Sequence, residues 1–312
     1  MTTAVVKRNL PSYLMLSEVE LNDRVRRARQ LMDPACRLCP RACGTKRMAG
    51  QRGACGAGPG LKVASCNLHF GEEPPISGSA GSGTIFVSHC NLSCVYCQNY
   101  PISQLGHGVE TTAEGLGDMM VALQERGAHN INWVTPSHEV SHLLDGLARA
   151  RQKGLAIPIV YNTSGYDSVT ALKLLNGVVD IYLADMRYAD GRTAFHYSGV
   201  DNYPRVNREA IHEMHRQVGD LVLDNGGIAR RGLVIRHLIL PGGLSGTDEI
   251  LGYVSREISN RTAISLMSQF FPAYQAGRSE AIGRRIKREE YEEAKGIMAR
   301  HGLERGWIQE LD

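Results

Sequence analysis

The sequence lacks any apolar run that reaches the roughly 18 residues needed for a membrane-spanning helix. Its charge is nearly balanced, because 35 basic and 32 acidic residues give a formal net charge of +3. That excess is too small to favour nucleic acid as a partner. The first eight residues lack the apolar core of a secretory signal peptide. These absences predict a cytoplasmic protein that binds neither membrane nor nucleic acid.

Cysteine is sparse, with eight in 312 residues, which is far below the density of a disulfide-rich secreted domain. Seven of the eight fall into two groups with short spacings, an arrangement typical of metal ligands in a reducing compartment. The eighth, Cys66, stands alone and is more typical of a small buried hydrophobic residue.

The most informative group is Cys90, Cys94 and Cys97, spaced C-x3-C-x2-C directly after an apolar run, 84–87, that reads as a strand. Three thiolates on one loop can hold three irons of a [4Fe-4S] cluster. No fourth cysteine follows closely, so one iron would stay open to a substrate or cofactor. The alternative is a zinc loop closed by His89 or a distant cysteine, because structural zinc takes four nitrogen or sulfur ligands.

The second group is Cys36, Cys39, Cys43 and Cys55, with the spacing C-x2-C-x3-C-x11-C. It supplies four soft ligands on a segment whose glycines and proline suit tight turns around one metal centre. A structural zinc and a fully ligated second Fe–S cluster both fit, and composition does not choose between them. Four free thiols are the remaining alternative.

From residue 84 onward, strand-like and helix-like patterns alternate, which predicts an α/β fold with a parallel sheet or an open barrel. In such barrels the chemistry gathers at the carboxyl ends of the strands. The expected strands are 84–88, 130–134, 157–161, 180–183, 233–240 and 263–268. The expected helices between them are 113–126, 140–153, 167–175, 205–218 and 247–258.

Three segments are predicted. Residues 1–78 form an N-terminal extension with the four-cysteine metal module and a helix at 17–32. Residues 79–275 form the barrel, and residues 276–312 form a helical extension with a helix at 289–301.

Polar residues follow the predicted strands, among them Thr135, Ser137, Asn162, Asp185 and Arg187. Ser137 and Asn162 also suit helix caps or turns. Arg236 is different, because it interrupts an apolar strand, where a charge is rarely buried without a partner. A carboxylate ligand would satisfy its guanidinium. Upstream, His69, Glu72 and Glu73 fit a substrate-binding role and ordinary surface charges equally well.

Six stretches between Cys36 and Tyr274 share motifs with a known family. They are Cys39-Pro-Arg-Ala-Cys43, His69-Phe-Gly-Glu-Glu-Pro-Pro-Ile-Ser-Gly78, Cys90-Asn-Leu-Ser-Cys94-Val-Tyr-Cys97, Tyr161-Asn-Thr-Ser-Gly-Tyr166, Asp180-Ile-Tyr-Leu-Ala-Asp185-Met-Arg187 and Arg236-His-Leu-Ile-Leu-Pro-Gly242. With them the chain resembles the radical S-adenosylmethionine (SAM) superfamily, in its pyruvate formate-lyase-activating-enzyme-like branch. The resemblance implies a partial (β/α)6 TIM-like barrel with a cysteine-rich N-terminal extension.

The resemblance also implies site roles. Cys90, Cys94 and Cys97 would hold the cluster, with the amino and carboxylate groups of SAM on the open iron. The backbone at Tyr96 would meet the adenine, and Asp185 and Arg236 would hold the amino-acid end and the ribose. Asn162 and Asp185, with Thr163, would shape a small cation site.

Three departures from the family pattern stand out. Thr135-Pro136-Ser137 replaces a Gly-Gly-Glu-Pro motif, so Thr135, Ser137 or Asp185 would take the SAM ammonium. Asp185-Met-Arg187 stands where Asp-x-Lys is common. The guanidinium of Arg187 can still bind a carboxylate, but with a geometry that differs from that of a lysine ammonium group. Asn162 stands where an acidic residue is common, which weakens the cation-site inference.

By this resemblance the protein is an oxidoreductase that receives one electron from flavodoxin or ferredoxin. It would cleave SAM to a 5′-deoxyadenosyl radical and take hydrogen from a substrate. That substrate is either the glycine of a glycyl-radical enzyme, or a peptide or small metabolite. A non-catalytic metal-binding scaffold is the third alternative. No hydrogen-relay residue can be chosen, since each candidate has an equally good structural role: Tyr274, His138, Glu139 and Cys66.

Overall fold

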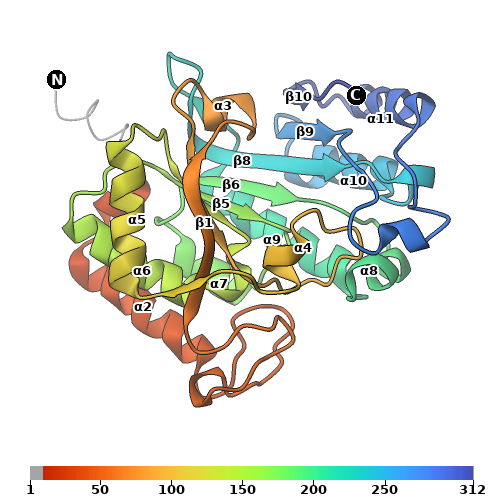
Figure 1. Ribbon diagram of the computed structural model, residues 1–312. Helices are drawn as coiled ribbons and strands as arrows, with labels where there is room; N and C mark the ends of the chain where they lie inside the picture. Colours follow the sequence, from red (N-terminus) through yellow and green to blue (C-terminus); the bar gives the residue numbers. More distant parts are fainter. Residues whose placement is uncertain (1–9, 312) are drawn as a thin grey trace.

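The computed structural model describes residues 10–311 (Figure 1). The expectation of no signal peptide rests on residues 1–8 and lies outside this range. So do the outermost residues of the predicted segments 1–78 and 276–312. Within the described range, no helix is both long enough and apolar enough to cross a membrane.

The architecture is α/β, built on a ten-stranded, mostly parallel sheet. Six parallel strands lie side by side in chain order, and all six predicted strands are confirmed to within a few residues. They are β2 (Ser82–Val87), β4 (Ile131–Val134), β5 (Ile159–Thr163), β6 (Ile181–Asp185), β8 (Ala229–Leu238) and β9 (Ala263–Met267).

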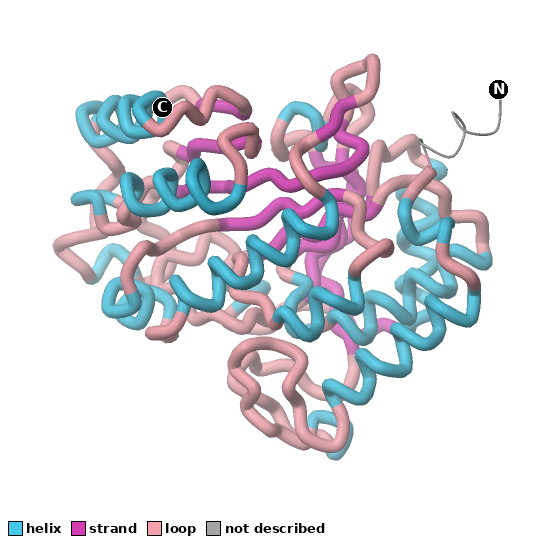
Figure 2. Tube along the Cα trace, turned by 180° about the vertical axis from the view of Figure 1, so that it is seen from behind, coloured by secondary structure: helices cyan, strands magenta, loops and turns pink. Residues whose placement is uncertain are grey.

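The predicted helices are also confirmed, and they lie on the outside of the sheet (Figure 2). They are α2 (Glu18–Met32), α5 (Ala113–Glu125), α6 (Val140–Gln152), α7 (Val169–Leu175), α9 (Tyr203–Val218), α10 (Thr247–Tyr253) and α11 (Arg288–Arg300). The side chain of Ser17 caps α2 in a reciprocal arrangement with Glu20, which explains why that helix begins where it does.

Several further elements were not predicted. They are β1 (Leu61–His69), α3 (Pro74–Ser77), α4 (Tyr100–Ser103), β3 (Val109–Thr111), α8 (Gly191–Ser198), β7 (Val222–Leu223) and β10 (Gly306–Ile308). The strand β1 pairs antiparallel with both β2 and β3, and β10 pairs parallel with β9. Main-chain hydrogen bonds therefore join both predicted extensions to the sheet of the central segment.

Inside the curve of the sheet, α3 fills the end opposite the carboxyl ends of the strands. Its Ile76 is 1% exposed and packs in a small apolar cluster with inward side chains of the parallel strands, including Val160, Leu183 and Val234. Successive strand side chains point to opposite faces. The next inward positions along β5, β6 and β8 are therefore Asn162, Asp185 and Arg236. The inward side chains of these strands therefore form an apolar layer around Ile76 and, one step closer to the carboxyl ends, a polar layer.

Candidate cluster and cofactor site

The carboxyl ends of all six parallel strands line one cavity of about 480 Å³. Each strand contributes at least one side chain: Phe86, Val134, Asn162, Asp185, Arg236 and Met267. Six strands can share one cavity only if the sheet curves, so the open-barrel form of the α/β prediction agrees with the structure. The site also lies at the end of the strands where it was expected.

Nearly all the predicted site residues outside the N-terminal module line this cavity. They are Cys90, Cys94, Tyr96, Cys97, Thr135, Asn162, Asp185, Arg187 and Arg236. Ser137 is not among the lining residues. It is 2% exposed, and its hydroxyl lies 3.2 Å from the Thr163 Oγ1 atom.

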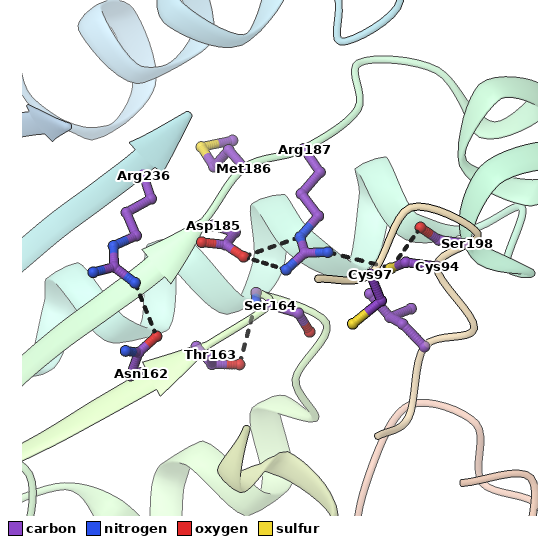
Figure 3. Close-up of polar contacts among 12 residues, drawn as sticks. Cys94, Cys97, Asn162, Thr163, Ser164, Asp185, Met186, Arg187, Ser198 and Arg236 are labelled. Atoms are coloured by element: carbon purple, nitrogen blue, oxygen red, sulfur yellow. Dashed lines mark hydrogen bonds and ion pairs between the residues drawn. The ribbon is translucent and has the colours of Figure 1, made fainter. Parts of the chain in front are cut away.

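Polar groups surround the sulfur atoms of the cysteine loop (Figure 3). Arg187 donates from Nη1 to Cys94 Sγ at 3.2 Å, and Ser198 Oγ lies 3.0 Å from the same sulfur. Ser103 Oγ lies 3.1 Å from Cys97 Sγ, and the Leu92 amide donates to Cys90 Sγ at 3.4 Å. Hydrogen-bond donors around sulfur suit thiolate ligands, so the residues present fit a bound cluster.

Without a metal, burial disfavours thiolates at these positions. Burial, reinforced by the neighbouring Cys94, raises the pKa of Cys90 to about 12. Coordination by a metal deprotonates a thiol outright. Across residues 10–311, no three His, Cys, Asp or Glu side chains surround a point closely enough to bind one ion. The cysteines that hold a [4Fe-4S] cluster lie further apart than the ligands of a single ion, because each cysteine binds a different iron. His89, the predicted zinc alternative, packs against Gly56 and Gly106 and does not line the cavity.

A chain of contacts links the strand exits to the cysteine loop. Asp185 accepts hydrogen bonds from Arg187, whose Nε lies 3.0 Å from Oδ2, and the same guanidinium reaches Cys94 (Figure 3). On the other side, the hydroxyl of Tyr188 bonds both Tyr96 and Ser198. Sequence reasoning missed Ser198, because α8 (Gly191–Ser198) is too short to show a helical apolar period, and it missed Tyr188, which lies in the loop before α8.

Arg236 has carboxylate partners within the chain. Its Nε and Nη2 donate to the two oxygens of Glu73 at 2.6 and 2.7 Å, and Nη2 also donates to Glu72. Burial alone would raise the pKa of Glu73, but the Arg236 charge lowers it below the usual range. Arg236 therefore needs no external carboxylate to balance its charge, and a contact between Arg236 and SAM stays a prediction. The surface-charge alternative is wrong, since the side chains of Glu72 and Glu73 are 5% and 4% exposed.

The four-cysteine segment folds back on itself. The Cys36 amide donates to Thr45 O, and the Gly44 amide donates to Cys36 O, both at 3.0 Å. Burial raises the pKa of Cys39 to about 12, and the nearby thiols of Cys55, Cys36 and Cys43 add to the shift. The structure therefore gathers all four thiols into one neighbourhood, while Cys43 remains exposed.

Two arginines attach this segment to the barrel. Arg47 is 1% exposed and pairs with Glu139 at 2.8 Å. Arg41 donates to the main-chain oxygens of Asn91 in the cysteine loop at 2.8 Å and of Gly199 at 2.9 Å. The four-cysteine segment thus lies directly against the C-x3-C-x2-C loop.

The hydrogen-relay candidates do not line the cavity. His138 and Glu139 belong to the buried network around Arg47. Tyr274 stacks on Tyr100 at 4.8 Å between ring centroids, and Cys66 packs against the main core from β1. Each of the four therefore has a structural role.

No protein-family model matches this chain. It is 28% identical over 277 residues to the uncharacterized protein MJ0674 of Methanocaldococcus jannaschii, an alignment that covers 86% of this chain and 75% of that protein. Among solved structures it is similar to HydG, described as a maturase of the [FeFe]-hydrogenase, with a TM-score of 0.47 and 13% identity. That match covers 70% of this chain and 49% of HydG, so the chain spans about half of HydG's length.

Proposed function

We propose that this protein is a radical SAM enzyme that reductively cleaves SAM and abstracts hydrogen from a bound substrate. One observation carries the proposal: Cys90, Cys94 and Cys97 open into the same cavity as the polar side chains at the strand exits. The loop therefore offers three cluster ligands beside a space that a cofactor and a substrate could share. When bound, a reduced [4Fe-4S] cluster supplies the electron that converts SAM to methionine and a 5′-deoxyadenosyl radical.

The chain's own residues then have defined tasks. Cys90, Cys94 and Cys97 would hold the cluster, and the main chain at Tyr96 would meet the adenine. Asp185 and Asn162, with Thr135, would orient the ribose and the amino-acid end. The strands that line the cavity would help to exclude water from the reacting atoms. Arg187 would offset negative charge on the cluster ligands, because it already donates to Cys94.

The four-cysteine segment is proposed as a second metal site that holds zinc or an auxiliary Fe–S cluster. The spacing of its side chains favours the Fe–S cluster, because no three ligands among residues 10–311 lie close enough together for one ion. The support for this site is the gathering of Cys36, Cys39, Cys43 and Cys55 against the first loop. Flavodoxin or ferredoxin is the proposed reductant, and the cytoplasm is the proposed location.

Three readouts separate the candidate functions. A glycyl-radical partner would give a radical EPR doublet on mixing with the reduced enzyme and SAM. A peptide or small metabolite would change in mass. A non-catalytic scaffold would cleave no SAM in the reduced, fully loaded protein.

The test of the proposal is 5′-deoxyadenosine release from SAM by anaerobically reconstituted, dithionite-reduced protein, with Cys94→Ala as the control. We expect release by the wild type and none by the variant. If the wild type releases no 5′-deoxyadenosine, either alone or with cell extract as a source of substrate, the proposal that this protein is a radical SAM enzyme is refuted.

A further inference from the structure

The four-cysteine segment and the strand that follows it carry charge of one sign. Residues 34–71 contain six basic residues and neither aspartate nor glutamate, although the whole chain has 35 basic and 32 acidic residues. Figure 1 shows the four-cysteine segment as loops that project from the bottom of the molecule, between α2 and β1. None of residues 36–55 lines the cavity, so a molecule bound to this segment would leave the cavity open to a substrate.

Three of the six basic side chains have partners within the protein. Arg41 and Arg47 attach the segment to the barrel, and Lys62 donates to a main-chain oxygen at 3.2 Å. The other three are exposed and form no ion pair among residues 10–311: Arg37, Lys46 and Arg52.

Two of these exposed basic residues adjoin the contacts of one exposed sulfur, that of Cys43. Lys46 follows Thr45, whose hydroxyl donates to Cys43 Sγ at 3.2 Å. Arg52 precedes Gly53, which lies so close to the same sulfur that an added Cβ atom would stand 3.0 Å from it. Both positive charges are therefore carried beside a candidate metal ligand that reaches the surface.

The third basic residue is brought to the same place by the main chain. Arg37 follows Cys36, whose carbonyl oxygen accepts a hydrogen bond at 3.0 Å from the amide of Gly44, the residue after Cys43. Each of the three basic residues thus directly adjoins a residue that contacts Cys43 or its neighbour. We call the exposed surface of these three residues around the Cys43 sulfur the basic face.

The basic face lies on a segment that contacts the C-x3-C-x2-C loop. Arg41, two residues before Cys43, donates to the main-chain oxygen of Asn91 at 2.8 Å, and Asn91 directly follows Cys90. The four-cysteine segment, with its own proposed metal site, therefore lies between the basic face and the proposed cluster of the loop.

Exposed positive charges without partners attract a protein of opposite charge and speed its association. Complexes between redox proteins bury small surfaces and are short-lived, so a face of three charges is large enough for one. Nucleic acid is also an anion, but its affinity comes from many phosphate contacts, and three exposed basic residues offer few of them. The charge and the exposed sulfur together favour an acidic redox protein.

We propose that the basic face is the docking surface for an acidic electron-transfer protein, and that the electron enters through the four-cysteine segment. In that step the partner is oxidised by one electron, which reduces the loop cluster from [4Fe-4S]2+ to [4Fe-4S]+, and no bond forms or breaks. This role rests on the proposed function, which requires an electron donor. The docking itself rests only on the exposed charges around Cys43.

The test uses the full-length, anaerobically reconstituted protein, with a flavodoxin and a ferredoxin of net negative charge as probes. Biolayer interferometry measures their affinity, and the bleaching of the iron–sulfur absorbance measures the rate of reduction by each reduced probe. Arg37→Glu/Lys46→Glu/Arg52→Glu should weaken binding by about tenfold or more and slow this reduction. Binding by the wild type should also weaken as NaCl is added, because salt screens exposed charges.

The matched control is Arg256→Glu/Arg285→Glu/Arg288→Glu, which makes the same change in net charge on exposed residues near α10 and α11. It should bind the probes and accept electrons as the wild type does. Iron content is measured in every variant. If the three glutamates lower the iron content, the corresponding triple glutamine variant of the basic face replaces them in the comparison.

Three results would overturn the docking surface. They are an equal loss of binding in the two triple variants, no binding of either probe by the wild type, and displacement of both probes by a single-stranded oligonucleotide. The last result would assign the basic face to nucleic acid.

Failure of the docking surface can be distinguished from failure of the proposed function, because dithionite reduces the cluster without a docked protein. Release of 5′-deoxyadenosine with dithionite, together with an equal loss in the two triple variants, would count against the docking surface alone. No release with dithionite, together with probe binding that depends on the basic face, would count against the proposed function alone.

Discussion

At the scale of single residues, the cysteine sulfurs are supported by donors that come from distant parts of the chain. Ser198 ends α8 and lies 3.0 Å from Cys94 Sγ, and it also bonds the Tyr188 hydroxyl at 2.7 Å. With Tyr188 donating to it, the Ser198 hydroxyl is oriented to donate to the sulfur. Hydrogen bonds to the sulfur ligands of a cluster stabilise its reduced form and raise its potential.

Ser198→Ala should therefore make the cluster harder to reduce. We expect a more negative midpoint potential in an EPR-monitored redox titration of the reconstituted protein. Ser93→Ala is the matched control, because Ser93 lies on the same loop but is exposed. An unchanged potential in Ser198→Ala would contradict the role given to this hydroxyl.

The two buried carboxylates beside Arg236 should differ in their importance for stability. Glu73→Gln removes the bidentate partner of Arg236 and should lower the free energy of unfolding by about 3–5 kcal/mol, the usual cost of stranding a buried charge. Glu72→Gln should cost less, because Glu73 still neutralises the guanidinium. Urea denaturation of both variants measures the difference, and an equal loss would contradict this division of roles.

At the scale of elements, the four-cysteine segment is attached to the barrel through a buried ion pair. Arg47 contacts Glu139 at 2.8 Å and also donates to the main-chain oxygens of Gly58 and His138. His142 holds the other oxygen of Glu139 at 2.6 Å. The guanidinium of Arg47 thus joins the four-cysteine segment to the start of α6.

Arg47→Met should destabilise the protein by about 3–5 kcal/mol, because it leaves the Glu139 charge buried beside no arginine. Arg37→Met, which changes an exposed arginine of the same segment, should change stability by less than about 0.5 kcal/mol. Chemical denaturation at neutral pH compares the two variants. A loss in Arg47→Met no greater than in Arg37→Met would show that the ion pair does not hold the segment in place.

The same pair predicts acid sensitivity. Burial alone would raise the pKa of Glu139, but the Arg47 charge and the His142 hydrogen bond outweigh it and lower the pKa to about 2. A carboxyl whose folded pKa is lowered stabilises the fold above its unfolded pKa of about 4.3. That contribution is lost as the pH falls through 2. Glu139→Gln should flatten this part of the stability–pH curve, and a curve as steep as that of the wild type would contradict the assignment.

The regular elements could be predicted because each parallel strand is a short apolar run and each outer helix has an apolar period. The buried ion pairs of Arg236 with Glu72 and Glu73 could not be predicted. Glu72 and Glu73 precede a four-residue helix, and only the insertion of α3 into the curve of the sheet makes their charges internal. Arg236 was recognised as unusual from its apolar neighbours, but its partners lie more than 160 residues away in the sequence.

At the scale of the whole molecule, the segments that carry the two cysteine groups lie against each other. Arg41 spans from one segment to the main chain of the other, and β1 continues from the four-cysteine segment into the sheet. The two proposed sites use different cysteines, so we expect that the metal of each can be removed separately.

The double variant Cys36→Ser/Cys39→Ser should lose the metal of the second site and retain the cluster of the first loop. Elemental analysis for iron and zinc, together with the visible absorption of the reconstituted protein, measures both. The reciprocal variant Cys94→Ala should lose the loop cluster only. Unchanged metal content in the double variant would contradict a second site.

The central claim is that Cys90, Cys94 and Cys97 hold a cluster with one iron open to SAM. The most direct measurement is the EPR spectrum of the dithionite-reduced, reconstituted Cys36→Ser/Cys39→Ser protein, recorded with and without SAM. We predict a reduced [4Fe-4S] signal whose g-values shift when SAM is added, because SAM binds the open iron. A reduced cluster whose spectrum is the same with and without SAM would contradict the claim.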